Sequence, residues 1–174
     1  GILLRGAIGH GMEADFNRKG TSTYATMIGR KVAEPAVTIV DDGTLPHYMG
    51  SLNFDDEGTP TQRTLLVDKG ILTSYMHDRI SAKHYGVKPT GNGRRESYQH
   101  YVQPRMRNTY MLAGDATPED VIRRAGTGLY VKDVSNGQVK IGEGDFAFYV
   151  LQGQLIENGR LGAPVKDINI MGNG

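Results

Sequence analysis

Glycine is the residue that most constrains the fold of this chain, since it occupies 24 of the 174 positions. That share is about twice the usual roughly 7%. Glycine destabilises the interior of a helix and is a common residue of tight turns. Together with nine tyrosines, no tryptophan and many β-branched residues, the glycines favour strands joined by tight turns over a helical bundle.

Apolar and β-branched runs mark the expected strands. A buried strand is expected at Val37–Gly43, and two more at 62–67 and 71–77 flank an Asp68-Lys69-Gly70 turn. Further strands are expected at 106–113, 128–134, 138–144, 145–156 and 160–170. Among the last four, Asn136-Gly137 and Asn158-Gly159 are strong hairpin signals.

Three segments have helical signals. The first is residues 2–14, the second is 78–86 with Gly86 as its stop, and the third runs from the N-cap Thr117 to Gly126. Residues 87–103 show no periodicity and are expected to form a functional or mobile loop. The fold class predicted is therefore α+β and mostly β, a curved or barrel-like antiparallel sheet with two or three short helices.

Length and charge limit the classes of function. The chain is long enough for one domain with a real core, so we expect a single domain over residues 1–174. A formal net charge of +1 gives no global field that would attract nucleic acid or an anionic membrane. The absence of cysteine excludes disulfides, thiolate ligands and a cysteine nucleophile within this chain. No apolar run approaches the roughly 20 residues that span a bilayer, so we expect a soluble, cytoplasmic protein.

The segment LLRGAIGHGMEADFNRKGTS, Leu3–Ser22, holds residue types suited to a metal site. His10, Glu13 and Asp15 lie close together in it, on a predicted helix whose three glycines require a packing or site reason. A catalytic zinc site keeps three protein ligands and a water, and this segment has one histidine. On residue types alone, a hydrogen-bonded helix end is therefore favoured over a metal site.

Three other groups of residues have less specific signals. Arg94 and Arg95 follow a glycine pair and could clamp a carboxylate or phosphate, although an exposed arginine pair in a flexible loop is an equal alternative. The acids of DDEGTPTQ, Asp55–Gln62, suit a turn that caps backbone amides better than a cation site. His77 and His84 could share a face of one short helix, but solvated polar positions are the better interpretation.

These stretches together resemble one protein family. The motifs are GHGMEADFNRKGTS, VDDGTLP, SLNFDDEGTPTQRTLLVDKGIL, GNGRRESY, PRMRNTYMLAG and a late GNG. In this order they resemble the TldD branch of the TldD/PmbA proteins, from about Leu3 to Gly174. The resemblance implies part of the β-rich C-terminal domain of a longer chain, without the family's N-terminal α/β domain and final cysteine-bearing segment.

The resemblance also implies a function. Family members of this branch are zinc metalloproteases that degrade unfolded or extended peptides and trim peptide-antibiotic precursors. They work in a dimer with a related subunit, TldE or PmbA, that lacks the zinc motif. A peptide substrate and a homodimer or heterodimer are therefore expected, while a membrane is not expected and nucleic acid is disfavoured as a partner.

The family's zinc motif, HExxxH, aligns with RGAIGH in this sequence. His10 takes the position of the second histidine ligand, Arg5 that of the first, and Gly6 that of the catalytic glutamate. The cysteine ligand would lie beyond Gly174. Residues five apart are about 140° apart on an ideal α-helix, so the motif requires a widened π-type turn, for which Gly9 is well suited.

Arg5 and Gly6 leave the motif without a ligand and without a base. A guanidinium has no lone pair to donate and repels a dication, and glycine cannot take a proton from a zinc-bound water. We therefore expect an altered or naturally inactive TldD-like chain that holds no catalytic zinc. The alternative is a silent subunit of the TldE/PmbA kind that binds peptide or completes a heterodimer.

Overall fold

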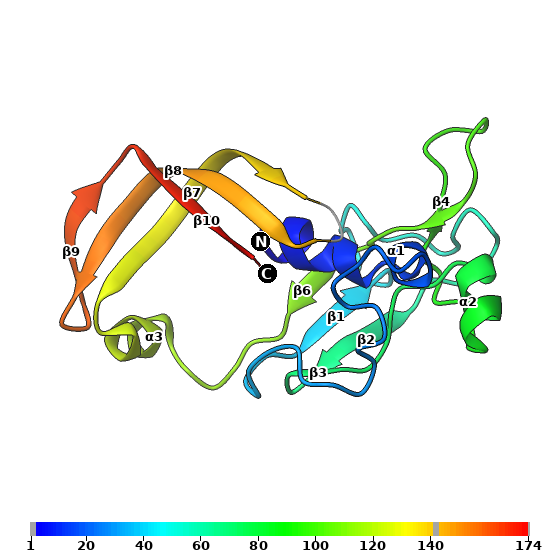
Figure 1. Cartoon of the computed structure of the whole chain (residues 1–174), viewed down its shortest axis with the longest axis horizontal. Coiled ribbons are helices and arrows are strands. Elements are labelled where there is room, and N and C mark those ends of the chain that lie inside the picture. Colours follow the sequence, from blue (N-terminus) through cyan, green and yellow to red (C-terminus); the bar gives the residue numbers. More distant parts are fainter. Residues whose placement is uncertain (1–2, 141–142, 174) are drawn as a thin grey trace. The chain divides into compact units, whose positions relative to one another are not determined.

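The computed structural model describes residues 3–140 and 143–173 and divides the chain into two compact units (Figure 1). The first unit contains residues 3–112 together with 140, 143 and 144. The second contains Ala113–Val139 and Asp145–Asn173. Strands outnumber helices in both units, and every strand pair of the described residues is antiparallel, which confirms the α+β, mostly β class. None of the sheets formed by these residues closes into a barrel.

The first unit is built on a four-stranded sheet with the order β3-β2-β1-β6. These strands are β1 Ile39–Asp42, β2 Arg63–Asp68, β3 Ile71–Leu72 and β6 Thr109–Met111. All four residues of β1 are buried; the apolar β-branched sequence predicts this for Ile39 and Val40, whereas Asp41 and Asp42 are buried charged residues. The β2–β3 hairpin turns at Lys69 and Gly70, whose φ values are 46° and 84°, and this confirms the predicted turn.

The predicted strand at 71–77 ends after two residues. Thr73 N–H still donates to Leu66 O of β2 at 2.8 Å, but Met76 exchanges backbone hydrogen bonds with the first segment instead: its N–H donates to Met12 O at 2.9 Å, and Ala14 N–H donates to Met76 O at 3.0 Å. This pairing also explains why residues 2–14 do not form one regular helix. They divide into the π-helix η1 Leu4–Ile8, the 3₁₀-helix η2 Gly9–Met12 and the start of α1 Ala14–Arg18.

The core of the first unit lies where these short helices cover the sheet. Met12 and Ala14 pack there with residues of β1, β2 and β3 and with Tyr75 and Met76. α2 Arg79–Tyr85 begins at a capping box formed by Asp78 and Ser81 and ends at Gly86, with φ 66°, as predicted. The non-periodic stretch 87–103 contains β4 Gly93–Arg94. This strand pairs with β5 Gln103–Pro104 to form a two-stranded antiparallel hairpin.

The second unit has a sheet centred on the long strand β8. Its elements are α3 Pro118–Ala125, β7 Gly128–Val139, β8 Asp145–Glu157, β9 Arg160–Val165 and β10 Ile168–Asn173. β7 pairs with one edge of β8, while β10 and β9 pair with successive parts of the other edge. α3 has the predicted start, with Thr117 and Asp120 forming a capping box and Pro118 at the first turn.

The two hairpin signals of this unit have different outcomes. Asn158-Gly159 does turn between β8 and β9, with φ values of 50° and 73°. The predicted turn at Asn136-Gly137 is wrong, because β7 runs through it and Gly137 pairs with Phe148 across a shift of register. The predicted strand at 138–144 is therefore partly the end of β7, and its residues 141–142 lie outside the described residues. No helix of the described chain is both long and apolar enough to span a lipid bilayer.

Candidate functional site

The segment that holds Arg5, Gly6 and His10 forms the π turn that the motif spacing predicts. η1 spans Leu4–Ile8, and Gly9 N–H donates to the carbonyl oxygen of Leu4, five residues earlier. Such hydrogen bonds bring residues five apart to the same side of the backbone, which an α-helix does not. Arg5 lies within this π-helix, and His10 follows it in the 3₁₀-helix η2.

Close packing explains two of the glycines in this segment. A Cβ on Gly9 would lie 2.3 Å from Met106 Sδ, and a Cβ on Gly11 would lie 2.7 Å from the ring of Tyr24. A side chain at Gly11 would meet the ring of Tyr24, and one at Gly9 would require the flexible Met106 side chain to move. The glycines let the bent helical segment press against the strands and loops that surround it.

Glu13 joins His10 to a distant arginine. His10 Nδ1 lies 3.0 Å from Glu13 Oε1, and Arg105 Nη1 donates to Glu13 Oε2 at 2.9 Å. Glu13 is fully buried, and burial raises the pKa of its carboxyl, against the opposing effects of the His10 hydrogen bond and of the charges on His10 and Arg105. The carboxylate thus fixes the orientation of the His10 ring, the role that such a partner has for histidine ligands of metals.

Asp15 and Asn17 complete the buried polar groups of the segment. Asn17 Nδ2 donates to Gly11 O at 2.8 Å and to Glu13 O at 2.9 Å, so this side chain holds the turn between η2 and α1. Asp15 Oδ1 is buried without a hydrogen bond and lies 3.9 Å from Arg105 Nη1. The predicted cluster of His10, Glu13 and Asp15 is therefore one hydrogen-bonded and ion-paired group around Arg105.

The donor atoms of this group do not fit a zinc site. His10 is its only nitrogen ligand, the carboxylates of Glu13 and Asp15 are engaged by Arg105, and Arg5 has no lone pair to offer. Within residues 3–140 and 143–173, no group of three or more His, Cys, Asp or Glu side chains is arranged to hold a metal ion. Catalytic zinc requires three such ligands.

A second buried network fixes the loops beside the segment. Asp41 on β1 accepts from Arg107 N at 2.9 Å, from Thr109 Oγ1 at 2.7 Å and from Asn92 Nδ2 at 2.6 Å. Asn92 in turn accepts from Thr90 Oγ1 at 2.6 Å. Burial raises the pKa of Asp41, while its hydrogen bonds act in the opposite direction. The network connects β1, β6 and the chain before β4.

The acidic turn at Asp55–Gln62 caps backbone amides, as predicted. Asp55 Oδ1 accepts from Glu57 N and Thr59 N at 2.9 and 2.8 Å, and its Oδ2 accepts from Gly93 N at 2.9 Å. Asp56 Oδ2 accepts from Arg95 N at 2.7 Å. The acids therefore position the start of the β4–β5 hairpin.

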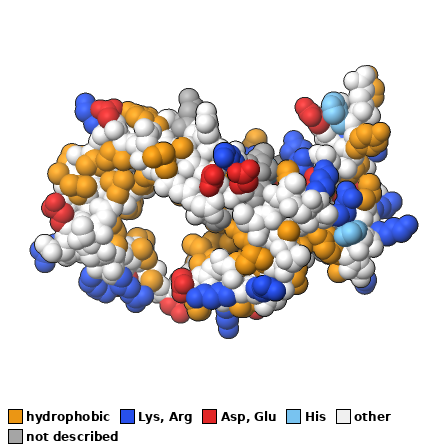
Figure 2. Space-filling view, in the orientation of Figure 1, with side chains coloured by type: hydrophobic (Ala, Val, Ile, Leu, Met, Phe, Trp, Pro, Cys, Tyr) orange, Lys and Arg blue, Asp and Glu red, His pale blue; other side chains and the backbone are white. Residues whose placement is uncertain are grey.

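Arg94 and Arg95 lie at the base of this hairpin, whose loop extends away from the rest of the unit in Figure 1. Both are exposed, and with Arg105 and His100 they line a hollow of about 380 Å³. Arg105 thus connects the arginine pair to Glu13 and His10. In Figure 2, Lys and Arg side chains gather on the visible face of this unit around α2.

The histidines His77 and His84 do not share a helix face, so that possibility is wrong. His77 precedes α2 and is buried, whereas His84 is exposed on α2. The ring of Tyr85 packs against both histidines. Its centroid lies 5.5 Å from the ring centroid of His77 and 4.9 Å from that of His84. Burial lowers the pKa of His77 to about 4. Both histidines line a hollow of about 540 Å³.

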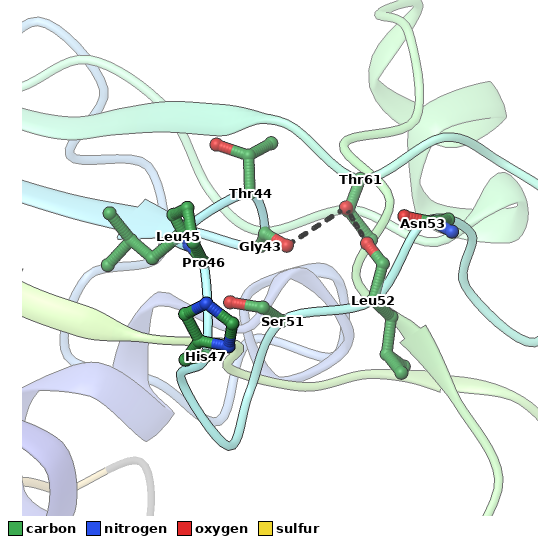
Figure 3. Close-up of a pocket in the computed structure, with 9 residues that line it drawn as sticks. All are labelled: Gly43, Thr44, Leu45, Pro46, His47, Ser51, Leu52, Asn53 and Thr61. Atoms are coloured by element: carbon green, nitrogen blue, oxygen red, sulfur yellow. Dashed lines mark hydrogen bonds between the residues drawn. The ribbon is translucent and has the colours of Figure 1, made fainter.

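A smaller hollow lies beside the end of β1 (Figure 3). It measures about 400 Å³ and is lined by the loop 43–53 and Thr61. Thr61 Oγ1 donates to the carbonyl oxygen of Leu52 and lies 3.2 Å from that of Gly43. The ring of His47 forms part of one wall, and no Asp, Glu, Lys or Arg among the described residues lines this hollow. It is a product of loop packing with little chemistry to offer.

Comparison with known proteins identifies the family. Residues 1–174 match the family described as PmbA/TldA metallopeptidase C-terminal domain. The chain belongs to this family. A protein of Buchnera aphidicola (subspecies Acyrthosiphon pisum) named metalloprotease TldD homolog is 51% identical over 174 residues, which are 100% of this chain and 36% of that protein. The chain therefore spans about a third of the length of such curated PmbA/TldD relatives.

More distant members agree in name and fold. A Saccharolobus solfataricus protein named zinc metalloprotease TldD homolog is 34% identical, over 99% of this chain and 39% of that protein. A Thermotoga maritima structure described as a modulator of a DNA gyrase superimposes with TM-score 0.85 at 29% identity, over 98% of this chain and 39% of that one. The structure of TldE from Thermococcus kodakarensis superimposes with TM-score 0.82 at 26% sequence identity, over 98% of this chain and 39% of that one.

Sequence reasoning missed Arg105, Asn17 and Asp41. All three lie within the quoted motifs GHGMEADFNRKGTS, VDDGTLP and PRMRNTYMLAG, but no role was assigned to them, and Arg105 is 92 positions from Glu13. The roles of Arg105 and Asp41 depend on contacts between segments far apart in the chain, whereas Asn17 bonds to backbone oxygens only four and six residues away.

Proposed function

We propose that this protein is a TldD-like metalloprotease subunit that binds unfolded or extended peptides, such as peptide-antibiotic precursors, without cleaving them. The observation that carries the proposal is the π-helix η1, which holds Arg5 and leads directly into the 3₁₀-helix η2 that holds His10. This turn keeps the spacing of the family motif, while Arg5 and Gly6 stand at the positions of its first ligand and its base. The activity proposed for the family uses zinc, but the motif of this chain does not bind it.

The strand β6 supports the binding of extended peptide. Within the described residues, β6 pairs with β1 alone and is the end strand of its sheet. Thr109 and Tyr110 of β6 line the same cleft as Arg5. An extended peptide can pair with the edge of a sheet through backbone hydrogen bonds, which makes few demands on its side chains.

A second candidate function is that of a non-catalytic partner of the TldE/PmbA kind. It is favoured by the missing ligand and base and by the similarity to TldE of Thermococcus kodakarensis. In this role the protein would complete a heterodimer with an active subunit, and a homodimer is the alternative assembly. The cytoplasmic location expected from the sequence stays a prediction.

The test measures zinc and cleavage in the protein at its natural length. We expect no stoichiometric zinc by elemental analysis and no cleavage of an unstructured peptide, because one histidine cannot hold catalytic zinc. The variant Arg5→His with Gly6→Glu should gain zinc, and adding His10→Ala to it should remove the zinc again. Failure of the double variant to bind zinc would show that the motif is aligned wrongly.

Two further outcomes separate the candidates. Stoichiometric zinc together with peptide cleavage in the unaltered protein would refute the non-cleaving function. If an active TldD-type subunit gains activity only when this protein is added, the partner function is supported. The matched control for that addition is the same subunit mixed with an unrelated protein.

A further inference from the structure

A cleft of about 930 Å³ in the first unit is lined by arginines from three separate elements. Arg5 lies on η1, Arg94 on β4, and Arg107 in the segment between β5 and β6. No Asp or Glu of the described residues lines this cleft. Its charged groups are therefore all positive.

The three arginines differ in how they are held. Arg107 is half-buried, with Nε donating to Gly91 O at 3.1 Å and Nη2 donating to Gly93 O at 3.0 Å. Arg5 and Arg94 are exposed, and in the described part of the chain their side chains make no hydrogen bond or ion pair. Arg107 thus has a fixed place in the wall, and the other two have unused donors.

Two of these arginines are close enough to interact. Burial lowers the pKa of Arg107, and the charge of Arg94 acts in the same direction. The charges of Asp55, Asp41 and Asp56 act in the opposite direction, but none of these three aspartates lines the cleft. An anion in the cleft would relieve the repulsion between like charges.

The rest of the lining is largely apolar. Tyr48, Met49 and Leu52 are exposed large hydrophobic residues of the loop after β1, and all three line this cleft. Met106, which contacts the Gly9 position, lines it too. A ligand that fits such a surface joins an anionic group to an apolar one. A bare inorganic anion would leave the apolar part of the wall unused.

We propose that this cleft binds the free C-terminal carboxylate of an extended peptide whose last residue is apolar, with Arg5 and Arg94 donating to the carboxylate. A guanidinium offers two parallel N–H donors that match a carboxylate. Tyr48, Met49 and Leu52 then cover the last side chain. The proposal rests on peptide binding as the function of the protein, and it gives Arg5 a positive role at the position of the missing zinc ligand.

The experiment compares two forms of one short, unstructured, N-terminally labelled peptide that ends in leucine, one with a free carboxylate and one amidated. Binding to the protein at its natural length is followed by fluorescence anisotropy. We expect the amidated peptide to bind at least about tenfold more weakly, the loss that follows from removing charge-assisted hydrogen bonds. Arg5→Gln should remove most of this difference, and Arg94→Gln should reduce it.

Two control variants accompany them. Arg30→Gln removes an exposed arginine that does not line the cleft and should leave the difference between the peptides unchanged. Arg5→Lys keeps the charge without the planar fork and should give an intermediate difference. Because Arg5 is exposed, these variants are expected to fold, which circular dichroism checks.

The outcomes separate this proposal from the proposed function. Equal binding of the two peptides, unaffected by Arg5→Gln, would overturn the carboxylate site and leave peptide binding intact. Absence of binding by either peptide would overturn both. Displacement of both peptides alike by inorganic phosphate, through Arg5, would identify a general anion site and also overturn the proposal.

Discussion

The two units of this chain bury different kinds of residue. In the described part of the chain, every buried polar or charged residue belongs to the first unit, among them Glu13, Asp41 and Asn92. The second unit buries apolar residues of β8, namely Phe148, Val150 and Ile156, and none of the residues of α3. Buried polar groups require partners in fixed places, so they define loop positions closely. The candidate site lies in the unit that has them.

The largest expected effect tests this dependence on polar partners. Asp41→Ala leaves Arg107 N, Thr109 Oγ1 and Asn92 Nδ2 without their acceptor. Each buried donor left unpaired costs about 1–3 kcal/mol, so the free energy of unfolding of the first unit should fall by about 4 kcal/mol. Urea unfolding measures the total, and hydrogen exchange assigns the loss to a unit.

The matched variant in the second unit is Asp133→Ala. Asp133 is exposed on β7, and its Oδ1 accepts only from the adjacent Val134 N. Its removal should cost less than about 0.5 kcal/mol. Similar losses from the two aspartates would contradict the contrast between the units.

The next effect tests what the second unit depends on. A Cβ on Gly137 would lie 2.0 Å from Phe148 Cδ1 and 2.7 Å from Ala147 O. Gly137→Ala must therefore displace β7 from β8, at a cost of about 3 kcal/mol. Gly128, on the same strand, has open space at its Cβ position, so Gly128→Ala should be nearly neutral in the same unfolding measurement. A neutral Gly137→Ala would show that the bulge adapts easily.

The smallest of these effects is a dependence on pH. The pKa of His77 is about 4 in the folded protein and about 6.5 in the unfolded chain. As the pH falls through this window, only the unfolded chain takes up the proton, so the contribution of His77 lowers the free energy of unfolding. Between about pH 7 and about pH 5 we expect a loss of about 2 kcal/mol.

His77→Gln isolates this contribution. Glu13 and Asp41 have raised pKa values, so they favour the folded state as the pH falls and oppose His77. The difference between the unaltered protein and His77→Gln removes their effect. The exposed His84, changed in the same way, serves as the control, and an equal shift in both variants would contradict the assignment to burial.

Local signals in the sequence were sufficient where neighbours in the chain decide the structure. α3 begins and ends where Thr117, Pro118 and Gly126 predict it, and the turns at Gly70 and Gly159 follow from their dipeptides. Asn136-Gly137 has the same local signal as Asn158-Gly159. It forms a bulge because β8 supplies a paired strand through Phe148, and a partner in another strand is invisible to a local pattern.

The candidate site shows the same division. The π turn follows from the spacing between Arg5 and His10, and the hydrogen-bonded character of the His10 cluster follows from its residue types. The contact between Arg105 and Glu13 could not be predicted from the sequence, because it joins residues 92 positions apart. The role of His10 at a metal position and those of Arg94 and Arg95 in substrate binding stay predictions.

The π turn also has a consequence for the length of the chain. A turn closed between residues five apart contains one residue more than an α-helical turn, and each residue of an α-helix advances the chain by about 100°. Shortening the Leu4–Ile8 segment by one residue would yield an ordinary helix, but it would rotate Arg5 by that angle relative to His10 and Glu13. This segment can therefore exchange side chains far more easily than it can lose a residue.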